Sequence, residues 1–220
     1  LQKGKNIGRS ILMRGEHALK VELPFKLADK PLRLKKKFSP TVPFYFPKFV
    51  LNKFTVKAFN FLYFNKQRPK VVKNIIDYET FFYPLDAIND WNRIYGKSGF
   101  IQYQMVIPKE KGEEGMRRIL ETIANSGQGS FLAVLKLFGK NNPLAYNSFP
   151  FEGYTLALDF KLNRELVQLV NNLDKIVEEF GGRIYLTKDS MSKSSLTNYL
   201  KNVESSKFTS LQSKRIARGA

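Results

Sequence analysis

The sequence predicts an α+β fold of the ferredoxin-like kind, in which an antiparallel sheet carries two helices on one face. Three observations carry this prediction. From residue 98 onward, segments with the two-residue period of strands alternate with segments that have the helical period. These segments follow one another in the order β-α-β-β-α-β. The chain has 220 residues, of which 43% are hydrophobic, so it can bury a core.

Four stretches have the composition and period of strands. Residues 101–107 alternate apolar side chains with glutamines, which predicts a strand with one apolar and one polar face. Two apolar, β-rich runs, Ser130–Phe138 and Tyr154–Leu162, predict the second and third strands, with a loop containing Gly, Pro and Asn between them. Residues 183–187 predict a short last strand.

Two stretches between these strands have helical spacing. Apolar residues from Met116 to Ile123 form one face, and Ser126-Gly127 ends that helix. In the second helix Asn163 can cap the N-terminus, and apolar residues between 166 and 177 form a stripe. Gly181-Gly182 ends it.

The N-terminal third is strongly basic. Residues 1–74 hold 18 Lys or Arg and three acidic residues, whereas residues 75–220 hold 19 and 16. Four prolines between residues 30 and 47 predict a loop. Residues 49–64 contain no Gly or Pro and are mostly apolar, which predicts a helix packed on more than one face.

These patterns divide the chain into three expected parts. Residues 1–74 form a basic, aromatic-rich loop and helix segment, residues 75–187 form the sheet with its helices, and residues 188–220 form a helical C-terminal segment. The sequence begins with Leu1 rather than Met, so we expect a piece of a longer chain.

Composition excludes several classes of protein. The chain has no Cys and one His, His17, so we expect no disulfide scaffold, no Cys nucleophile and no metal site. No apolar run approaches the ~20 residues of a membrane span, and no signal peptide is visible, so we expect a cytoplasmic protein. Gly127-Gln128-Gly129 lacks a third glycine and follows a helix, so it is not a nucleotide-phosphate motif.

An RNA-recognition sheet is one alternative for a basic chain with this strand order. Glu152-Gly153-Tyr154 opens the third strand where such a motif would lie. Glu152 stands in place of a cation, and Leu156 and Leu158 stand in place of stacking aromatics. We therefore predict no nucleic-acid partner.

Peripheral contact with a membrane is a second alternative. Between Lys26 and Lys57, Lys and Arg alternate with Phe, Tyr, Leu and Pro. Such a segment is either a solvated basic loop and helix face, which is the commoner case, or a surface attracted to anionic lipid headgroups. The sequence leaves both interpretations open.

A series of short strings runs in the same order as in one known family. They are Gly8-Arg9-Ser10, Lys26-Leu27, Lys30-Pro31-Leu32-Arg33, Asn52-Lys53-Phe54, Tyr83-Pro84-Leu85-Asp86, Trp91-Asn92-Arg93-Ile94-Tyr95-Gly96, Gly99-Phe100-Ile101-Gln102-Tyr103-Gln104, Lys136-Leu137-Phe138-Gly139, Ser148-Phe149-Pro150 and Phe180-Gly181-Gly182-Arg183-Ile184-Tyr185-Leu186-Thr187-Lys188-Asp189-Ser190. Together they resemble the C-terminal half of the decaprenylphosphoryl-β-D-ribose oxidase family, within the vanillyl-alcohol-oxidase-like FAD-linked superfamily.

The resemblance implies the substrate or cap domain of a two-domain flavoprotein of cell-wall polysaccharide biosynthesis. Most of the FAD would be held by a separate N-terminal domain, to which residues 188–220 would return. Its activity would be oxidation of a sugar hydroxyl, of a polyprenyl-phosphate-linked pentose or a related polyol, by hydride transfer to flavin. A nicotinamide-dependent reductase would be a partner that takes the keto-sugar, and this chain alone would bind FAD weakly and be inactive.

The resemblance also implies site residues. Substrate-binding positions are Gln102, Gln104, Lys136, Thr155, Phe82 and Ala157; cofactor-binding positions are Tyr185 and Lys188; and Lys188 is the catalytic candidate. The strand pattern agrees in part, because the two glutamines share a polar face and Lys136 interrupts an apolar run. Phe82 stands where family members have Tyr, and Ala157 stands where the mycobacterial type has Cys, so polar contacts differ and the sugar is left open.

Overall fold

The computed structural model describes residues 4–33, 38–47, 49–140 and 148–188. Its contacts divide the chain into two compact units: Leu1–Arg9, Asn52–Val56 and Ser98–Ala220 form one, and Ser10–Leu51 and Lys57–Lys97 form the other. The sheet lies in the first unit. The expected division into residues 1–74, 75–187 and 188–220 stays a prediction, and the expected C-terminal helical segment lies outside the described residues beyond Lys188.

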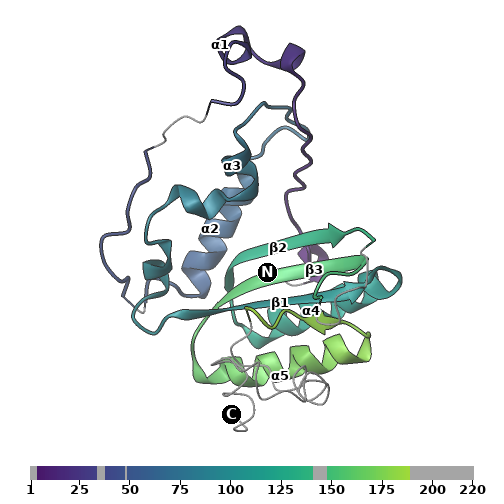
Figure 1. The fold of residues 1–220 in the computed structure, drawn as a ribbon. Coiled ribbons are helices and arrows are strands. Elements are labelled where there is room, and N and C mark those ends of the chain that lie inside the picture. Colours follow the sequence, from purple (N-terminus) through teal and green to yellow (C-terminus); the bar gives the residue numbers. More distant parts are fainter. Residues whose placement is uncertain (1–3, 34–37, 48, 141–147, 189–220) are drawn as a thin grey trace, which may run out of the picture. The chain divides into compact units, whose positions relative to one another are not determined.

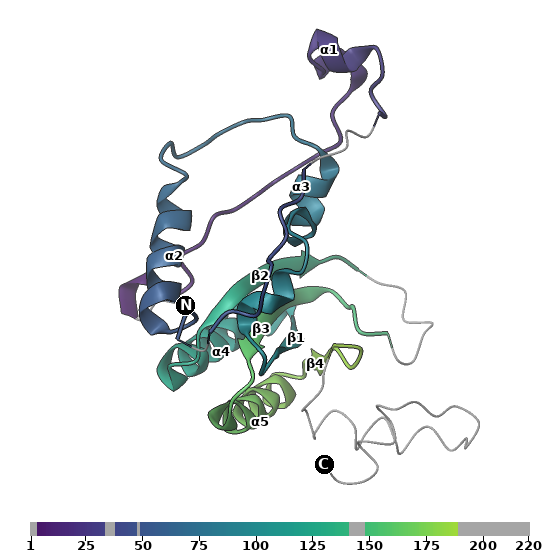
Figure 2. The same cartoon turned by 90° about the vertical axis from the view of Figure 1, so that its left-hand side faces the viewer.

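The first unit contains a four-stranded antiparallel sheet (Figure 1). Its strands are β1 (Phe100–Pro108), β2 (Ser130–Phe138), β3 (Gly153–Lys161) and β4 (Arg183–Ile184). They lie in the order β2-β3-β1-β4, and helices α4 (Gly112–Ser126) and α5 (Arg164–Glu179) lie on one face (Figure 2). The predicted α+β fold and the order β-α-β-β-α-β are confirmed.

Helix α4 ends, and helix α5 begins and ends, where the sequence predicted. The Asn163 side chain accepts a hydrogen bond from the Leu166 backbone N–H at 2.9 Å and so caps α5. Gly127 and Gly181 have φ angles of 72° and 70°, the left-handed conformation that follows a helix end. Local chemistry therefore marks the end of α4 and both ends of α5.

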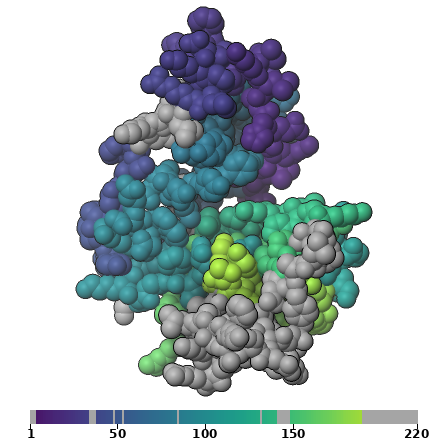
Figure 3. Space-filling view, in the orientation of Figure 1, coloured from purple at the N-terminus to yellow at the C-terminus, as the bar shows by residue number. Residues whose placement is uncertain are grey.

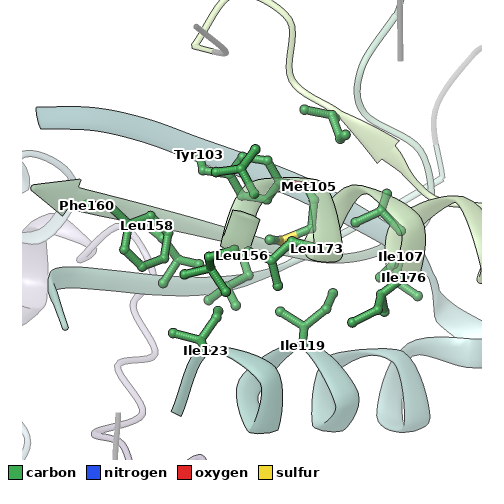
Figure 4. Packing of buried hydrophobic residues seen from close by; sticks show 14 of the residues in the cluster. Tyr103, Met105, Ile107, Ile119, Ile123, Leu156, Leu158, Phe160, Leu173 and Ile176 are labelled. Atoms are coloured by element: carbon green, nitrogen blue, oxygen red, sulfur yellow. The ribbon is translucent and has the colours of Figure 1, made fainter. Parts of the chain in front are cut away.

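The core lies between the sheet and these two helices (Figure 4). Every second residue of the central strands points into it: Tyr103, Met105 and Ile107 from β1, and Leu156, Leu158 and Phe160 from β3. The helices contribute Ile119, Ile123, Leu173 and Ile176. The Tyr103 hydroxyl donates to Asp174 Oδ1 at 2.6 Å, which satisfies a carboxylate buried beside this core.

The last strand is shorter than predicted. β4 comprises Arg183 and Ile184, whereas the sequence indicated a strand as far as Thr187. The Tyr185 N–H still donates to the Gln104 carbonyl at 2.8 Å, so the chain stays beside β1 for one further residue. It then turns, and the Lys188 N–H donates to the Tyr185 carbonyl at 3.1 Å.

The second unit is built from short helices and extended chain. Its α-helices are α1 (Phe25–Ala28), α3 (Tyr78–Phe82) and most of α2 (Lys53–Asn65), and 3-10 turns occur at Lys20–Glu22, Pro84–Ala87 and Trp91–Tyr95. The extended part of residues 38–47 is held by contacts with Asn89 and Arg93. Thr41 forms a bridge with Asn89, and Arg93 Nη1 donates to the Val42 carbonyl at 2.8 Å.

Helix α2 corrects one expectation. The apolar run in residues 49–64 does form a helix, but it begins at Lys53, and none of its described side chains is buried. The prediction that it packs on more than one face is wrong, because an apolar composition shows that a face can be covered but not that a neighbour covers it.

Candidate functional site on the distal face of the sheet

The face of the sheet opposite α4 and α5 gathers the predicted substrate-binding residues. In antiparallel pairs, directly opposed residues lie on the same face. Gln104 opposes Ala157, Val106 opposes Thr155, and Thr155 in turn opposes Lys136. We call this surface the distal face: Gln102, Gln104, Val106, Val134, Lys136, Phe138, Thr155, Ala157, Asp159 and Arg183. Five predicted residues from three strands therefore share one surface.

A hydrogen-bonded pair lies at the centre of the distal face. Gln104 Nε2 donates to Thr155 Oγ1 at 3.1 Å, and that hydroxyl donates to the Met105 carbonyl at 2.8 Å. Gln104 is 8% exposed and Thr155 is 1% exposed. The possibility that this glutamine is only solvated is therefore wrong. Because the amide nitrogen makes the internal bond, the amide oxygen of Gln104 is available to accept a hydrogen bond from a ligand hydroxyl.

Ring contacts connect the ends of the two edge strands, through Phe138 of β2, Phe149 and Tyr185 after β4. The Phe149 ring stacks on Tyr185 with ring centroids 4.6 Å apart, and Phe138 meets Phe149 edge-on at 6.0 Å. Arg183 Nη1 donates to the Ser148 carbonyl at 2.7 Å, which fixes the residue before Phe149. The segment that contains Tyr185 reaches the molecular surface (Figure 3).

Lys188 lies beside this aromatic stack. Its Nζ is 5.9 Å from the centroid of the Tyr185 ring, within the range of a cation–π contact. The turn that joins the two residues holds them together, and Lys188 is half-buried. The structure therefore brings both predicted cofactor-binding residues to one place, next to the strand that carries Gln104.

Two predicted residues have different surroundings. Lys136 lies on the distal face, but its side chain is exposed. The apolar residues on either side of it in the sequence therefore did not indicate that Lys136 is buried. Phe82 lies in the other compact unit, at the end of α3, where its ring meets Phe81 at 5.0 Å.

Asp159 and Arg183 on the distal face, and Phe149 beside it, were not singled out as site residues from the sequence. Asp159 is 2% exposed, opposes Gln102, and its N–H donates to Ser130 Oγ at 3.1 Å. The only sequence feature that pointed to Asp159 was the presence of an acidic residue within an apolar predicted strand. Phe149 and Arg183 stand in strings that resemble the family, but no spacing indicated their contact with Tyr185 or Ser148.

The third strand does not present the aromatics of an RNA-recognition sheet on its distal face. Tyr154 packs against the helix-covered core, and the distal positions of β3 are Thr155, Ala157 and Asp159. Glu152 bonds Lys109 Nζ at 2.9 Å, which lowers the pKa of the Glu152 carboxyl and raises the pKa of Lys109. The acidic residue in this motif is thus used in a surface ion pair.

Within the described ranges, no three His, Asp or Glu side chains come together as a possible metal site. The helices of the same described residues include none whose length and apolar character would let it span a membrane.

Comparison with known proteins identifies relatives of this chain by sequence similarity. The decaprenylphosphoryl-beta-D-ribose oxidase of Mycolicibacterium smegmatis is 41% identical over 193 residues, which cover 86% of this chain and 41% of that protein. The chain is a relative of this oxidase. The relationship confirms the family resemblance noted in the sequence, and a match to 41% of the oxidase is consistent with similarity to one half of it.

A second relative is more distant. An uncharacterized protein of Streptomyces coelicolor, described as lying in the mprA 5' region, is 24% identical over 198 residues, or 86% of this chain and 53% of that protein. The chain thus spans 41% of the length of the oxidase and 53% of the length of the Streptomyces protein. No protein-family model matches it.

Thr155 provides a test of the distal-face geometry in this relative of the oxidase. Thr155→Val removes the hydroxyl that accepts from Gln104 and donates to Met105, so the buried Gln104 amide loses this partner. We expect a loss of about 1–3 kcal/mol in the free energy of unfolding, measured by urea denaturation. Thr155→Ser keeps the hydroxyl and should lose less. Equal losses for the two variants would contradict the described hydrogen bonds.

Proposed function

We propose that the chain forms the substrate-binding part of an FAD-dependent oxidoreductase that oxidises a hydroxyl of a polyprenyl-phosphate-linked pentose. The observation that carries the proposal is the convergence of residues matched to the oxidase family on one surface. The distal face presents the Gln104 amide and the Lys136 amine, and the Tyr185–Lys188 turn adjoins it.

The Tyr185–Lys188 turn has groups that fit a flavin. The stacked rings of Phe149 and Tyr185 offer a flat apolar surface, and Lys188 places a cation beside it. We propose that Tyr185 and Lys188 hold the isoalloxazine end of FAD, with the remaining contacts made by a domain outside this chain. When bound, FAD supplies the acceptor for the hydride.

The chain's own residues bind and orient the sugar. The Gln104 amide is held by Thr155, so it can accept from a sugar hydroxyl without first being ordered. Lys136 offers an exposed ammonium for the phosphate or a hydroxyl of the substrate. Lys188 places positive charge near the reacting oxygen, where negative charge develops as the hydroxyl proton leaves.

The hydroxyl proton passes in this proposal to a residue of the other domain or to a lysine whose amine is neutral, because the distal face and the Tyr185–Lys188 turn contain no histidine. The keto-sugar product would then be a substrate for a nicotinamide-dependent reductase, as the family resemblance implies.

The direct experiment mixes the FAD-loaded protein that contains this chain with a polyprenyl-phosphate pentose under anaerobic conditions. We expect loss of the visible absorbance of oxidised flavin and formation of one keto-sugar per flavin. Polyprenyl phosphate without the sugar is the control and should leave the flavin oxidised. A flavin that stays oxidised with every such pentose, but is reduced by a free polyol, would contradict the proposed substrate class.

A further inference from the structure

The middle of the basic N-terminal third contains no acidic residue. Residues 30–76 hold ten Lys and two Arg, and no Asp or Glu. Because these cations have no acidic neighbours along the chain, the stretch has a positive electrostatic potential, which attracts an anionic partner.

Helix α2 lies within this stretch, and its outward stripe is apolar. Phe54, Phe61 and Leu62 are 84%, 59% and 68% exposed. With the exposed Ala58 they occupy positions i, i+4, i+7 and i+8, which fall on one side of a helix. The half-buried residues recur on the other side: Val56, Asn60 and Phe64.

Cations lie on the helix and directly after it in the chain. Lys57 is exposed on the helix itself, and the chain that follows it carries the exposed residues Lys66, Arg68 and Lys70. Val71, next in the chain, is 75% exposed. A row of exposed apolar side chains bordered by cations is the pattern of a helix that lies in the interface of a membrane.

We propose that α2 and the residues after it, as far as Val71, form a docking surface for an anionic lipid membrane. The apolar stripe enters the boundary between headgroups and acyl chains, while the flanking ammonium and guanidinium groups bind lipid phosphates. The proposal does not depend on the proposed oxidoreductase function.

The chemistry of the stripe favours lipid over single-stranded nucleic acid. Nucleic-acid surfaces present aromatic rings for base stacking and are rich in Arg. Phe54 and Phe61 of the stripe are aromatic, but Ala58, Leu62 and Val71 are aliphatic and cannot stack, and ten of the twelve cations are Lys. Aliphatic side chains instead match the acyl region of a bilayer.

The absence of Cys from the chain permits a local probe. Leu62→Cys carries an environment-sensitive dye on the stripe, and Leu135→Cys carries it at a matched position on β2, where Leu135 is 55% exposed. We expect the dye at position 62 to shift to shorter wavelength on vesicles of equal parts phosphatidylglycerol and phosphatidylcholine, and the dye at position 135 not to respond. Added salt should weaken the binding.

Unlabelled variants measure the contribution of the stripe by vesicle co-sedimentation. Phe54→Ser/Phe61→Ser/Leu62→Ser should bind anionic vesicles about 30-fold more weakly or worse. The matched variant Leu135→Thr/Leu137→Thr should bind as the natural chain does, because both leucines are exposed outside the proposed surface.

Three outcomes would overturn the proposal. They are equal binding to pure phosphatidylcholine vesicles, a dye at position 62 that does not respond to anionic vesicles, and a dye at position 62 that responds to polyuridylate while vesicles fail to bind. None of these outcomes bears on flavin reduction, so this proposal and the proposed function fail separately.

Discussion

Phe160→Ala is expected to lower the free energy of unfolding by about 3–5 kcal/mol. The Phe160 side chain is fully buried in the core between the sheet and the two helices. It opposes Ile101 on β1 and Ser130 on β2, so it lies where three strands meet. Truncation removes the buried area of the ring and leaves a cavity that rigid strands on both sides can fill only in part.

Urea denaturation of the chain, followed by far-ultraviolet circular dichroism, measures this loss. Phe54→Ala is the matched control, because Phe54 is 84% exposed and its removal should change the free energy of unfolding by less than about 1 kcal/mol. If the two variants were destabilised equally, the placement of the core between the sheet and the helices would be wrong.

The sheet and its two helices could be predicted from the sequence because their signals are local. Strand alternation, a side chain that caps a helix and a glycine that ends one each act within a few residues. The Asn163 cap and the left-handed Gly127 and Gly181 show this directly. The strand order followed because β-α-β-β-α-β segments have one common antiparallel arrangement.

The rest depends on contacts that no local pattern encodes. Whether α2 is covered depends on a neighbour, and the apolar composition alone predicted burial that the described residues do not have. The stack of Phe149 on Tyr185 joins residues on either side of β3 and α5. The end of β4 after Ile184 likewise reflects the turn toward Lys188 rather than a change in composition.

Only part of the candidate site could be predicted from the sequence. Resemblance supplied the residues, and strand register then placed Gln104, Thr155 and Lys136 on one face. Burial of Gln104 through its bond to Thr155 could not be predicted, because a polar strand face is equally consistent with solvent. Phe82 remains a prediction, since it lies in the other compact unit.

Lys188→Ala is expected to slow flavin reduction in the FAD-loaded protein by about 10–100-fold. A charge-assisted contact to the reacting oxygen or to the reduced flavin contributes roughly 1.5–3 kcal/mol, which corresponds to one to two orders of magnitude in rate. Because the charge is needed most in the transition state, the rate constant should fall more than substrate affinity. Lys188→Arg keeps the charge and should retain most of the rate.

The control is Lys175→Ala. Lys175 is an exposed lysine on α5, the helix on the opposite face of the sheet from Gln104 and Thr155. Loss of this charge changes the net charge of the protein by the same amount as Lys188→Ala. Any general effect of charge on substrate binding will therefore appear in both variants.

The most direct measurement for the distal-face site is the single-turnover rate of flavin reduction, followed by stopped-flow absorbance with a polyprenyl-phosphate pentose. We predict that Lys188→Ala is slowed by about 10–100-fold at saturating substrate while Lys188→Arg and Lys175→Ala remain close to the natural protein. Unchanged reduction by a folded, FAD-loaded Lys188→Ala protein would contradict the placement of the reacting groups beside the Tyr185–Lys188 turn.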